Sequence, residues 1–307
     1  MSELEWVVIL PCGIAALVML VCKWLNLPAR AAWAKSVGSG YVVGQVGLAM
    51  RAAGWQAGIG SLTAPREAGD WLPWLVMAAA GITVLAAYAP RNWQRWIVSL
   101  AAVIAVAAPA RLLAGSVYVT SRWSALEKLG VIMVWSAAFA MVWTLLAAGR
   151  ANGQPRVRGG LLIMFAVGLA IALAIAGSFT YGELCGVAAA AIAGAVVARV
   201  PLSRVLKHDS PADADGDDLG LSGAAGAIAM ALGGLILLDY FYAELSGVSA
   251  ALLVVALVAA GGRLPVAWPR GPTGQIACRA MLCVVPLAIA LALAWTAMLA
   301  ERGTSGY

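Results

Sequence analysis

The chain alternates between long apolar runs and short polar connectors. A helix needs about 20 apolar residues, at 1.5 Å per residue, to cross the roughly 30 Å hydrocarbon layer of a membrane. The pattern predicts about ten such helices, at 6–25, 36–55, 71–89, 96–118, 129–148, 160–179, 181–200, 219–238, 244–261 and 276–299. The segment 201–218 is the longest polar connector, and the run at 36–55 is the most polar of the ten.

The composition supports this interpretation. Hydrophobic residues make up 63% of the 307 residues and charged residues only 11%, whereas soluble domains carry about 25% charged residues. With a mean hydropathy of +0.90, we expect a multi-pass protein of the cell (inner) membrane, whose main partner is the lipid bilayer. The basic residues sit in short connectors, so the pI of about 9.3 does not indicate nucleic-acid binding.

The basic residues also predict the orientation. Fourteen of the 20 Lys and Arg residues flank one set of connectors, within 23–35, 91–95, 150–158, 199–207 and 263–279. The positive-inside rule assigns these connectors, including 201–218, to the cytoplasm. Both termini are then predicted on the non-cytoplasmic side. If 36–55 did not cross the membrane, the charge asymmetry after it would reverse.

A short motif repeats along the chain. Tyr-Gly-Glu-Leu-Cys-Gly-Val at 181–187 returns as Tyr-Ala-Glu-Leu-Ser-Gly-Val at 242–248, which places Glu183 and Glu244 61 residues apart. Similar spacing occurs at Glu127, and in weaker form at Asp70. We therefore predict an all-α polytopic bundle of four parallel helix-hairpin repeats with one terminal helix at each end.

The acids of the repeat have two interpretations. Asp70, Glu127, Glu183 and Glu244 each begin a predicted helix on the outer side, where a carboxylate caps backbone N–H groups and faces the positive end of the helix dipole. The same acids would also form a ring around an outer vestibule. Asp239 is a fifth acid, which capping does not explain.

Two arginines add to the candidate pathway. Arg51 and Arg111 lie late in corresponding helices, 60 residues apart. An arginine at membrane depth needs a partner or a route for its head group to reach water. Pairing with Glu127, Glu183 or Asp70 is one explanation, and an anion site is the other. Gln45 lies on the same helix as Arg51 and completes the candidate set.

One helix carries an unbroken row of small residues. The row consists of Gly182, Gly186, Ala190, Gly194 and Ala198. Small residues allow close approach of helices in membranes, so we expect 181–200 to be central. Small-residue faces also offer contacts to a second copy of the chain or to other subunits of a membrane complex.

The sequence offers little support for catalysis. His208 is the only histidine, and it falls in the connector. The five cysteines form no C-x-x-C pair, and the Asp213-x-Asp215-x-Asp217 run lacks the turn glycine and the final glutamate of a calcium loop. We predict no catalytic residues, no metal and no cofactor.

Three functions remain. The leading one is a transporter or channel-like permease for a small solute or ion, with Arg51, Arg111 and the outer acids near its entrance. The alternative is a non-catalytic scaffold or assembly subunit. The third is an intramembrane enzyme based on paired carboxylates, which would require Glu183 and Glu244 to lie close together. A cavity reaching Gln45 or Arg111 would favour transport.

Overall fold

The computed structural model describes residues 5–116, 123–148, 155–205, 221–243, 245–262 and 272–304, which contain helices and no strand. This confirms the all-α class. The principal helices are α1 (Leu10–Trp24), α2 (Ala29–Ala53), α3 (Trp55–Thr63), α4 (Leu72–Tyr88), α5 (Gln94–Leu113), α6 (Ala125–Ala148), α7 (Pro155–Ile175), α8 (Phe179–Val205), α10 (Ala225–Ile228), α11 (Gly234–Tyr242), α12 (Gly247–Gly261) and α13 (Pro272–Thr304). Short π or 3-10 segments are η1 (Glu5–Ile9), η2 (Ala68–Trp71), η3 (Arg91–Trp93) and η5 (Ala229–Gly233).

Eight helical segments in the described part of the chain are long and apolar enough to cross a membrane. They are Val7–Trp24, Ala68–Tyr88, Arg91–Leu113, Ala125–Ala148, Val157–Ile175, Phe179–Ala198, Ala225–Tyr242 and Thr273–Ala300. α12 is apolar but has 15 residues, and α2 has 25 residues with several polar ones among them. The molecule is therefore compatible with a multi-pass membrane protein, while the ten-helix topology and the four repeats remain predictions.

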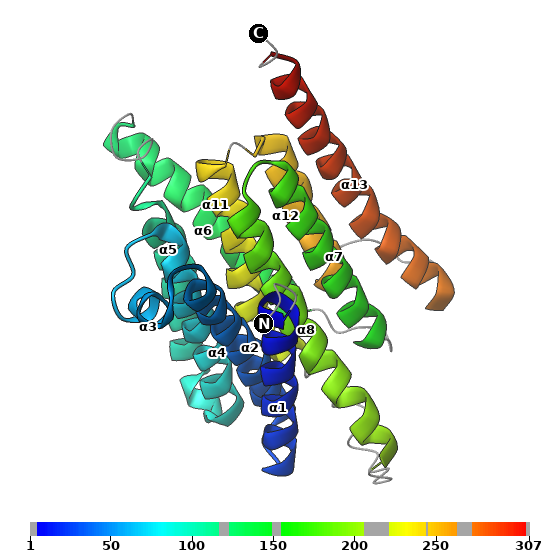
Figure 1. The fold of residues 1–307 in the computed structure, drawn as a ribbon. Coiled ribbons are helices and arrows are strands. Elements are labelled where there is room, and N and C mark those ends of the chain that lie inside the picture. Colours follow the sequence, from blue (N-terminus) through cyan, green and yellow to red (C-terminus); the bar gives the residue numbers. More distant parts are fainter. Residues whose placement is uncertain are drawn as a thin grey trace.

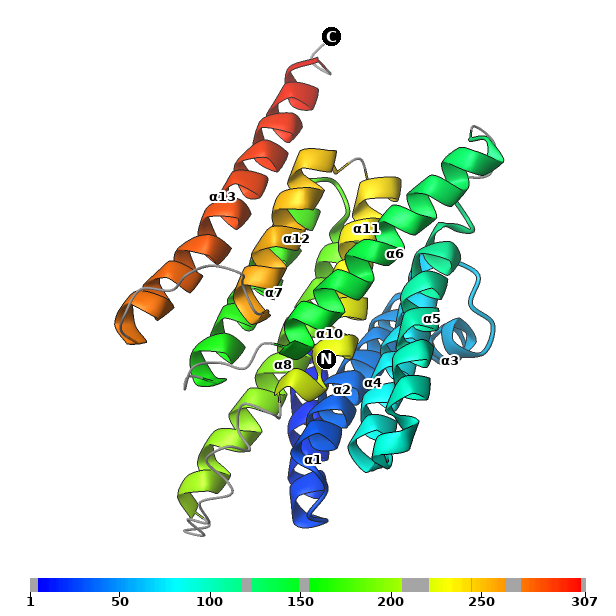
Figure 2. The same cartoon turned by 180° about the vertical axis from the view of Figure 1, so that it is seen from behind.

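The helices form a tilted bundle with two distinct ends (Figure 1). The α1–α2 and α4–α5 connections lie at one end, and the α7–α8 turn and the end of α11 lie at the other; the view from behind agrees (Figure 2). The first end carries Lys23 and Arg91, and we call it the basic end. The cytoplasmic assignment of the basic end remains a prediction.

The segment running through α10, η5 and α11 forms the centre of the bundle. In its membrane-spanning window 83% of the residues are buried, against 17% in α13 at the periphery. The π-helical segment η5 interrupts its regular hydrogen bonding. Such interruptions occur frequently at functional sites.

α8 packs against its neighbours through its row of small residues. A Cβ added at Gly194 would overlap the backbone of Cys12 in α1, and one at Gly186 would lie 2.9 Å from Val7 in η1. A Cβ at Gly182 would lie 2.9 Å from the Ala170 carbonyl oxygen of α7. Both alanines of the row are buried. These helices therefore approach closely because α8 presents almost no side chain at the contacts.

A buried arginine joins several helices at the basic end. Arg158 of α7 is 2% exposed, and it donates hydrogen bonds to the carbonyl oxygens of Leu146 in α6 and Gly261 in α12. Arg279 of α13 donates to the Gly262 carbonyl at 2.8 Å. A cation bound to the last carbonyls of a helix also faces the negative end of its dipole. Both arginines were predicted to flank connectors between helices, and in the structure both bind carbonyl groups at helix ends.

Several helix boundaries differ from the sequence expectation, and three of the differences move polar residues into helices or lengthen a helix toward the site. α2 already begins at Ala29, where Pro28 in an extended conformation precedes it, so most of the expected connector before residue 36 is helical. α8 continues to Val205, and residues 206–220 lie outside the described part. α11 continues to Tyr242 and not to 238. As a result, Asp239 lies inside a helix and is fully buried.

Candidate functional site

The turn between α7 and α8 builds one wall of the site. Gly177 adopts φ +99° just after α7. The Ser178 N–H donates to the Leu173 carbonyl at 3.0 Å, and the Gly177 N–H donates to the Ala174 carbonyl at 3.4 Å. This is the glycine-dependent Schellman ending of a helix. Because α8 starts at Phe179, the hairpin is short and the first turn of α8 is held beside the end of α7.

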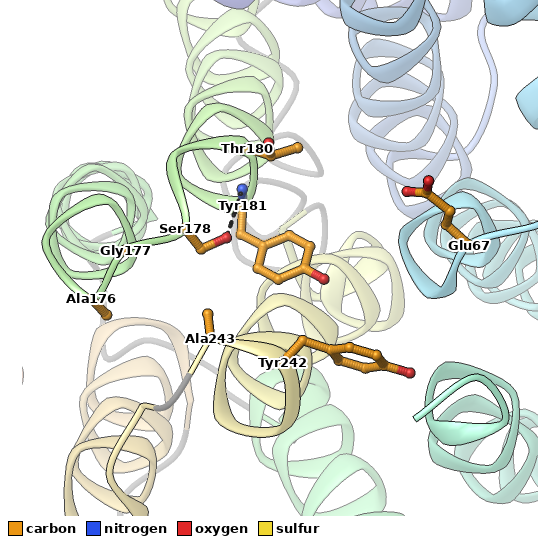
Figure 3. Close-up of a pocket in the computed structure, with 8 residues that line it drawn as sticks. All are labelled: Glu67, Ala176, Gly177, Ser178, Thr180, Tyr181, Tyr242 and Ala243. Atoms are coloured by element: carbon orange, nitrogen blue, oxygen red, sulfur yellow. Dashed lines mark hydrogen bonds between the residues drawn. The ribbon is translucent and has the colours of Figure 1, made fainter. Parts of the chain in front are cut away.

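A cavity of about 490 Å³ opens at this turn. It is lined by Glu67, Ala176, Gly177, Ser178, Thr180, Tyr181, Tyr242 and Ala243 (Figure 3). These residues come from the segment before α4, the α7–α8 hairpin and the end of α11. The lining combines four hydroxyl-bearing side chains with one carboxylate. Such a volume suits a small molecule, and the hydroxyl groups suit a polar one.

Tyr242 fixes the position of α11 at the cavity. Its hydroxyl group donates to the Leu112 carbonyl of α5 at 3.0 Å. In Figure 3, the Tyr242 side chain points away from the α7–α8 turn, while Tyr181 points toward the segment that carries Glu67. The two tyrosines of the repeated motif therefore meet at the same cavity from two different helices.

Aromatic side chains explain why α11 continues to this point. Phe241 lies 5.8 Å from Trp123 and 4.7 Å from Tyr240, measured between ring centroids. Tyr240 lies 5.9 Å from Trp135 of α6. The two contacts of Phe241 are edge-to-face, and such pairs stabilise a fold by more than the burial of their surface area alone. The last turn of α11 is thus packed against α6, and the helix does not end at Leu238.

Asp239 lies one helical turn deeper than the cavity. It precedes Tyr242 by three residues, so the two share one face of α11. Asp239 is 0% exposed, and neither of its carboxylate oxygens has a hydrogen-bond partner among the residues that the structure describes. Buried polar atoms without partners are rare in native proteins, and a buried acid in a membrane-spanning helix is a candidate functional residue.

Further polar groups lie deeper in the bundle. The Tyr41 hydroxyl of α2 is buried without a hydrogen-bond partner, as is Oε1 of Gln45 one turn further along the same helix. Cys185 of α8 is fully buried and lies near both Tyr41 and Asp239. The Gln45 Nε2 donates to the Gly69 carbonyl at 2.9 Å. α2 and α11 therefore both carry buried polar atoms that have no hydrogen-bond partner among the described residues.

The two arginines have protein partners. Arg51 of α2 forms an ion pair with Glu183 of α8, with 3.1 Å between Nη1 and Oε1, and both side chains are partly exposed. The guanidinium carbon of Arg111 lies 5.0 Å from the ring centroid of Trp71, a cation–π contact. Neither Gln45 nor Arg111 lines the cavity. This cavity therefore does not reach either of the two residues at which a cavity would favour transport.

Two of the predicted acids act at helix starts. The Asp70 carboxylate accepts hydrogen bonds from the N–H groups of Arg66 and Glu67, at 3.0 and 3.1 Å. Glu127 accepts from the Ser124 N–H at 2.7 Å, and the Glu127 N–H donates to Ser124 Oγ at 3.3 Å. This reciprocal pair is a capping box. Glu244 lies outside the described residues, so its distance from Glu183 is not defined.

Within the described ranges, no group of three or more His, Cys, Asp or Glu side chains is arranged to hold a metal ion. No family model, curated protein or solved structure matches the chain. The membrane class therefore rests on the helices themselves, eight of which are long and apolar enough to span a bilayer. Function must be argued from the site.

Proposed function

We propose that this protein is a permease for a small polar solute, with the cavity at the α7–α8 turn as its outer vestibule. The observation that carries this proposal is that Tyr242, which lines the cavity, follows Asp239 by one helical turn, and that Asp239 is a buried acid with no hydrogen-bond partner among the described residues. A purely structural bundle gains nothing from such a group, whereas transporters place ionisable side chains along their pathways. The π segment η5 precedes Asp239 on the same central helix.

The lining gives the class of solute. The described residues around the cavity include the carboxylate of Glu67 and two tyrosine rings, and no basic side chain. Carboxylates and aromatic faces both attract cations. The proposed solute is therefore small, polar, and neutral or cationic, and an organic anion would be disfavoured.

The alternative is a scaffold subunit, and the tight packing of α1, α2 and α8 favours it. A Cβ at Gly44 would overlap or crowd Val187 and Pro11, so this face of α2 is filled by its neighbours. A bundle with that packing, and with no passage beyond the cavity, would serve to hold partner helices. The two functions differ in whether water and solute enter below the vestibule.

The experiment that tests solute binding is thermal stabilisation of the purified protein by a panel of amines, zwitterionic amino acids, polyols and carboxylic acids. A bound solute stabilises by RT ln(1 + [L]/Kd), about 2.7 kcal/mol at 100 times its Kd. We expect stabilisation by at least one amine, amino acid or polyol, and its loss in Thr180→Val. Thr144→Val is the matched control, because Thr144 is exposed and its hydroxyl bonds only its own helix. Stabilisation by carboxylic acids alone, or equal loss in both variants, would overturn the proposal.

A further inference from the structure

The surroundings of Asp239 define the ionisation state that fits this conformation. The side chain is fully buried, and within the described part of the chain both carboxylate oxygens lack hydrogen-bond donors. An ionised carboxylate placed there has lost its hydration and gained no compensating interaction, which is strongly unfavourable. A protonated carboxyl group is neutral and loses far less on burial. The geometry therefore fits a carboxyl group that holds a proton.

A metal cation does not fit the same place. Hard cations need many oxygen ligands, about six to eight for Ca²⁺ and about six for Mg²⁺. The α8 side chains near Asp239 are a thiol and a phenol, Cys185 and Tyr181. No carboxylate cluster accompanies it in the described residues. A proton needs no coordination shell, so it is the cation that this site accommodates.

The titratable groups around Asp239 come from three elements. α8 contributes Tyr181 and Cys185, and α11 itself contributes Tyr242. α5 carries Arg111 at this end, and its exposed guanidinium group lies over the Trp71 ring. The described residues of α12 include no titratable side chain. Apart from Arg111, whose guanidinium group is already placed over Trp71, these are hydroxyl and thiol groups.

One of these hydroxyl groups also faces the cavity. Tyr181 lines the cavity together with Tyr242, which lies one helical turn after Asp239. The Tyr242 hydroxyl proton is engaged by the Leu112 carbonyl, whereas Tyr181 points across the cavity (Figure 3). Tyr181 is thus the hydroxyl group best placed between cavity water and the acid.

From these positions we infer that Asp239 is the proton-binding residue of the pathway, and that it exchanges its proton with cavity water through the Tyr181 hydroxyl. In the loading step, a hydronium ion gives a proton to the Tyr181 oxygen and becomes water, while the Tyr181 O–H proton moves to the Asp239 carboxylate. The step moves one proton and leaves the phenol unchanged. This inference rests on the proposed function, because it makes the permease proton-linked.

Infrared spectroscopy of the full-length protein in lipid bilayers tests the proton directly. A protonated carboxyl group shows a C=O stretch above the amide band, and that band shifts when D₂O replaces H₂O. We expect such a band at neutral pH in the wild type, its loss in Asp239→Asn, and its retention in Asp70→Asn, whose carboxylate caps a helix start on backbone N–H groups. Thermal unfolding of Asp239→Asn should match the wild type, since both side chains are neutral and similar in shape. A wild-type spectrum lacking the band, or a band that survives in Asp239→Asn, would overturn the inference.

The rate of the D₂O shift tests the route. We expect Tyr181→Phe to slow the shift several-fold, because it removes the hydroxyl group between the cavity and Asp239. Tyr240→Phe is the control, since Tyr240 belongs to the aromatic cluster on the same side of the bundle. An unchanged rate in Tyr181→Phe would refute the route. Failure of every solute to stabilise the protein would refute the permease proposal instead, and it would leave the infrared result standing.

Discussion

Gly194→Ala tests the close contact between α8 and α1. A Cβ at Gly194 would overlap the main chain of Cys12, where no flexible side chain can move aside, so the two helices must separate. Overpacking of this kind costs about 1–3 kcal/mol. Alanine also recovers about 1 kcal/mol of helix propensity relative to glycine. Gly13→Ala is the matched control in α1, because its Cβ would meet nothing within 4 Å.

The difference in unfolding free energy between the two variants isolates the cost of overpacking. Both gain the same helix propensity, so Gly194→Ala should be less stable than Gly13→Ala by about 1–3 kcal/mol. The assay is thermal unfolding in detergent with a thiol-reactive fluorogenic dye, which reports exposure of the buried Cys22, Cys185 and Cys283. Equal unfolding temperatures for the two variants would refute the proposed contact and the central place of α8.

Two further predictions concern charged groups. A double-mutant cycle of Arg51→Ala and Glu183→Gln should give a coupling free energy of only about 0.2–1 kcal/mol, because the ion pair is partly exposed. A coupling free energy above about 2 kcal/mol would contradict this expectation. Arg158→Met should destabilise by about 1.5–3 kcal/mol for each charged hydrogen bond lost to the Leu146 and Gly261 carbonyls. Arg158→Lys keeps the charge and should unfold at an intermediate temperature, whereas wild-type stability in Arg158→Met would show that the arginine does not join these helices.

Apolar run length was sufficient to predict the helical class. A helix needs only enough apolar residues to span the hydrocarbon layer, and it forms its backbone hydrogen bonds internally, so the apolar runs alone indicate the class. A helix was harder to predict for the polar run at 36–55, because its polar side chains are shielded by neighbouring helices that one segment of sequence does not reveal. Its start at Ala29 depends on Arg30 and Lys35 being tolerated in the first turns of a helix.

The site was only partly predictable. Asp239 entered the candidate set because capping did not explain it, but its burial depends on the aromatic contacts of Tyr240 and Phe241 that extend α11. The repeated Tyr-x-Glu motif drew attention to its acid, whereas the structure brings its tyrosines, Tyr181 and Tyr242, to one cavity. Glu67 carried no signal of its own, since its place at the cavity depends on contacts between distant segments.

The most direct test of the permease proposal is whether water reaches the polar groups below the vestibule. Three proteins are compared in membranes, each with one cysteine: Cys185 alone, Cys283 alone, and Thr180→Cys with the native cysteines replaced. Cys185 and Cys283 are both 0% exposed, but of these two cysteines only Cys185 lies near Asp239. Reaction is followed with a small, membrane-impermeant thiosulfonate reagent. A pathway predicts fast labelling at Thr180→Cys, slower but measurable labelling at Cys185 and none at Cys283; a Cys185 as inert as Cys283 would contradict the permease and identify a closed, packed bundle.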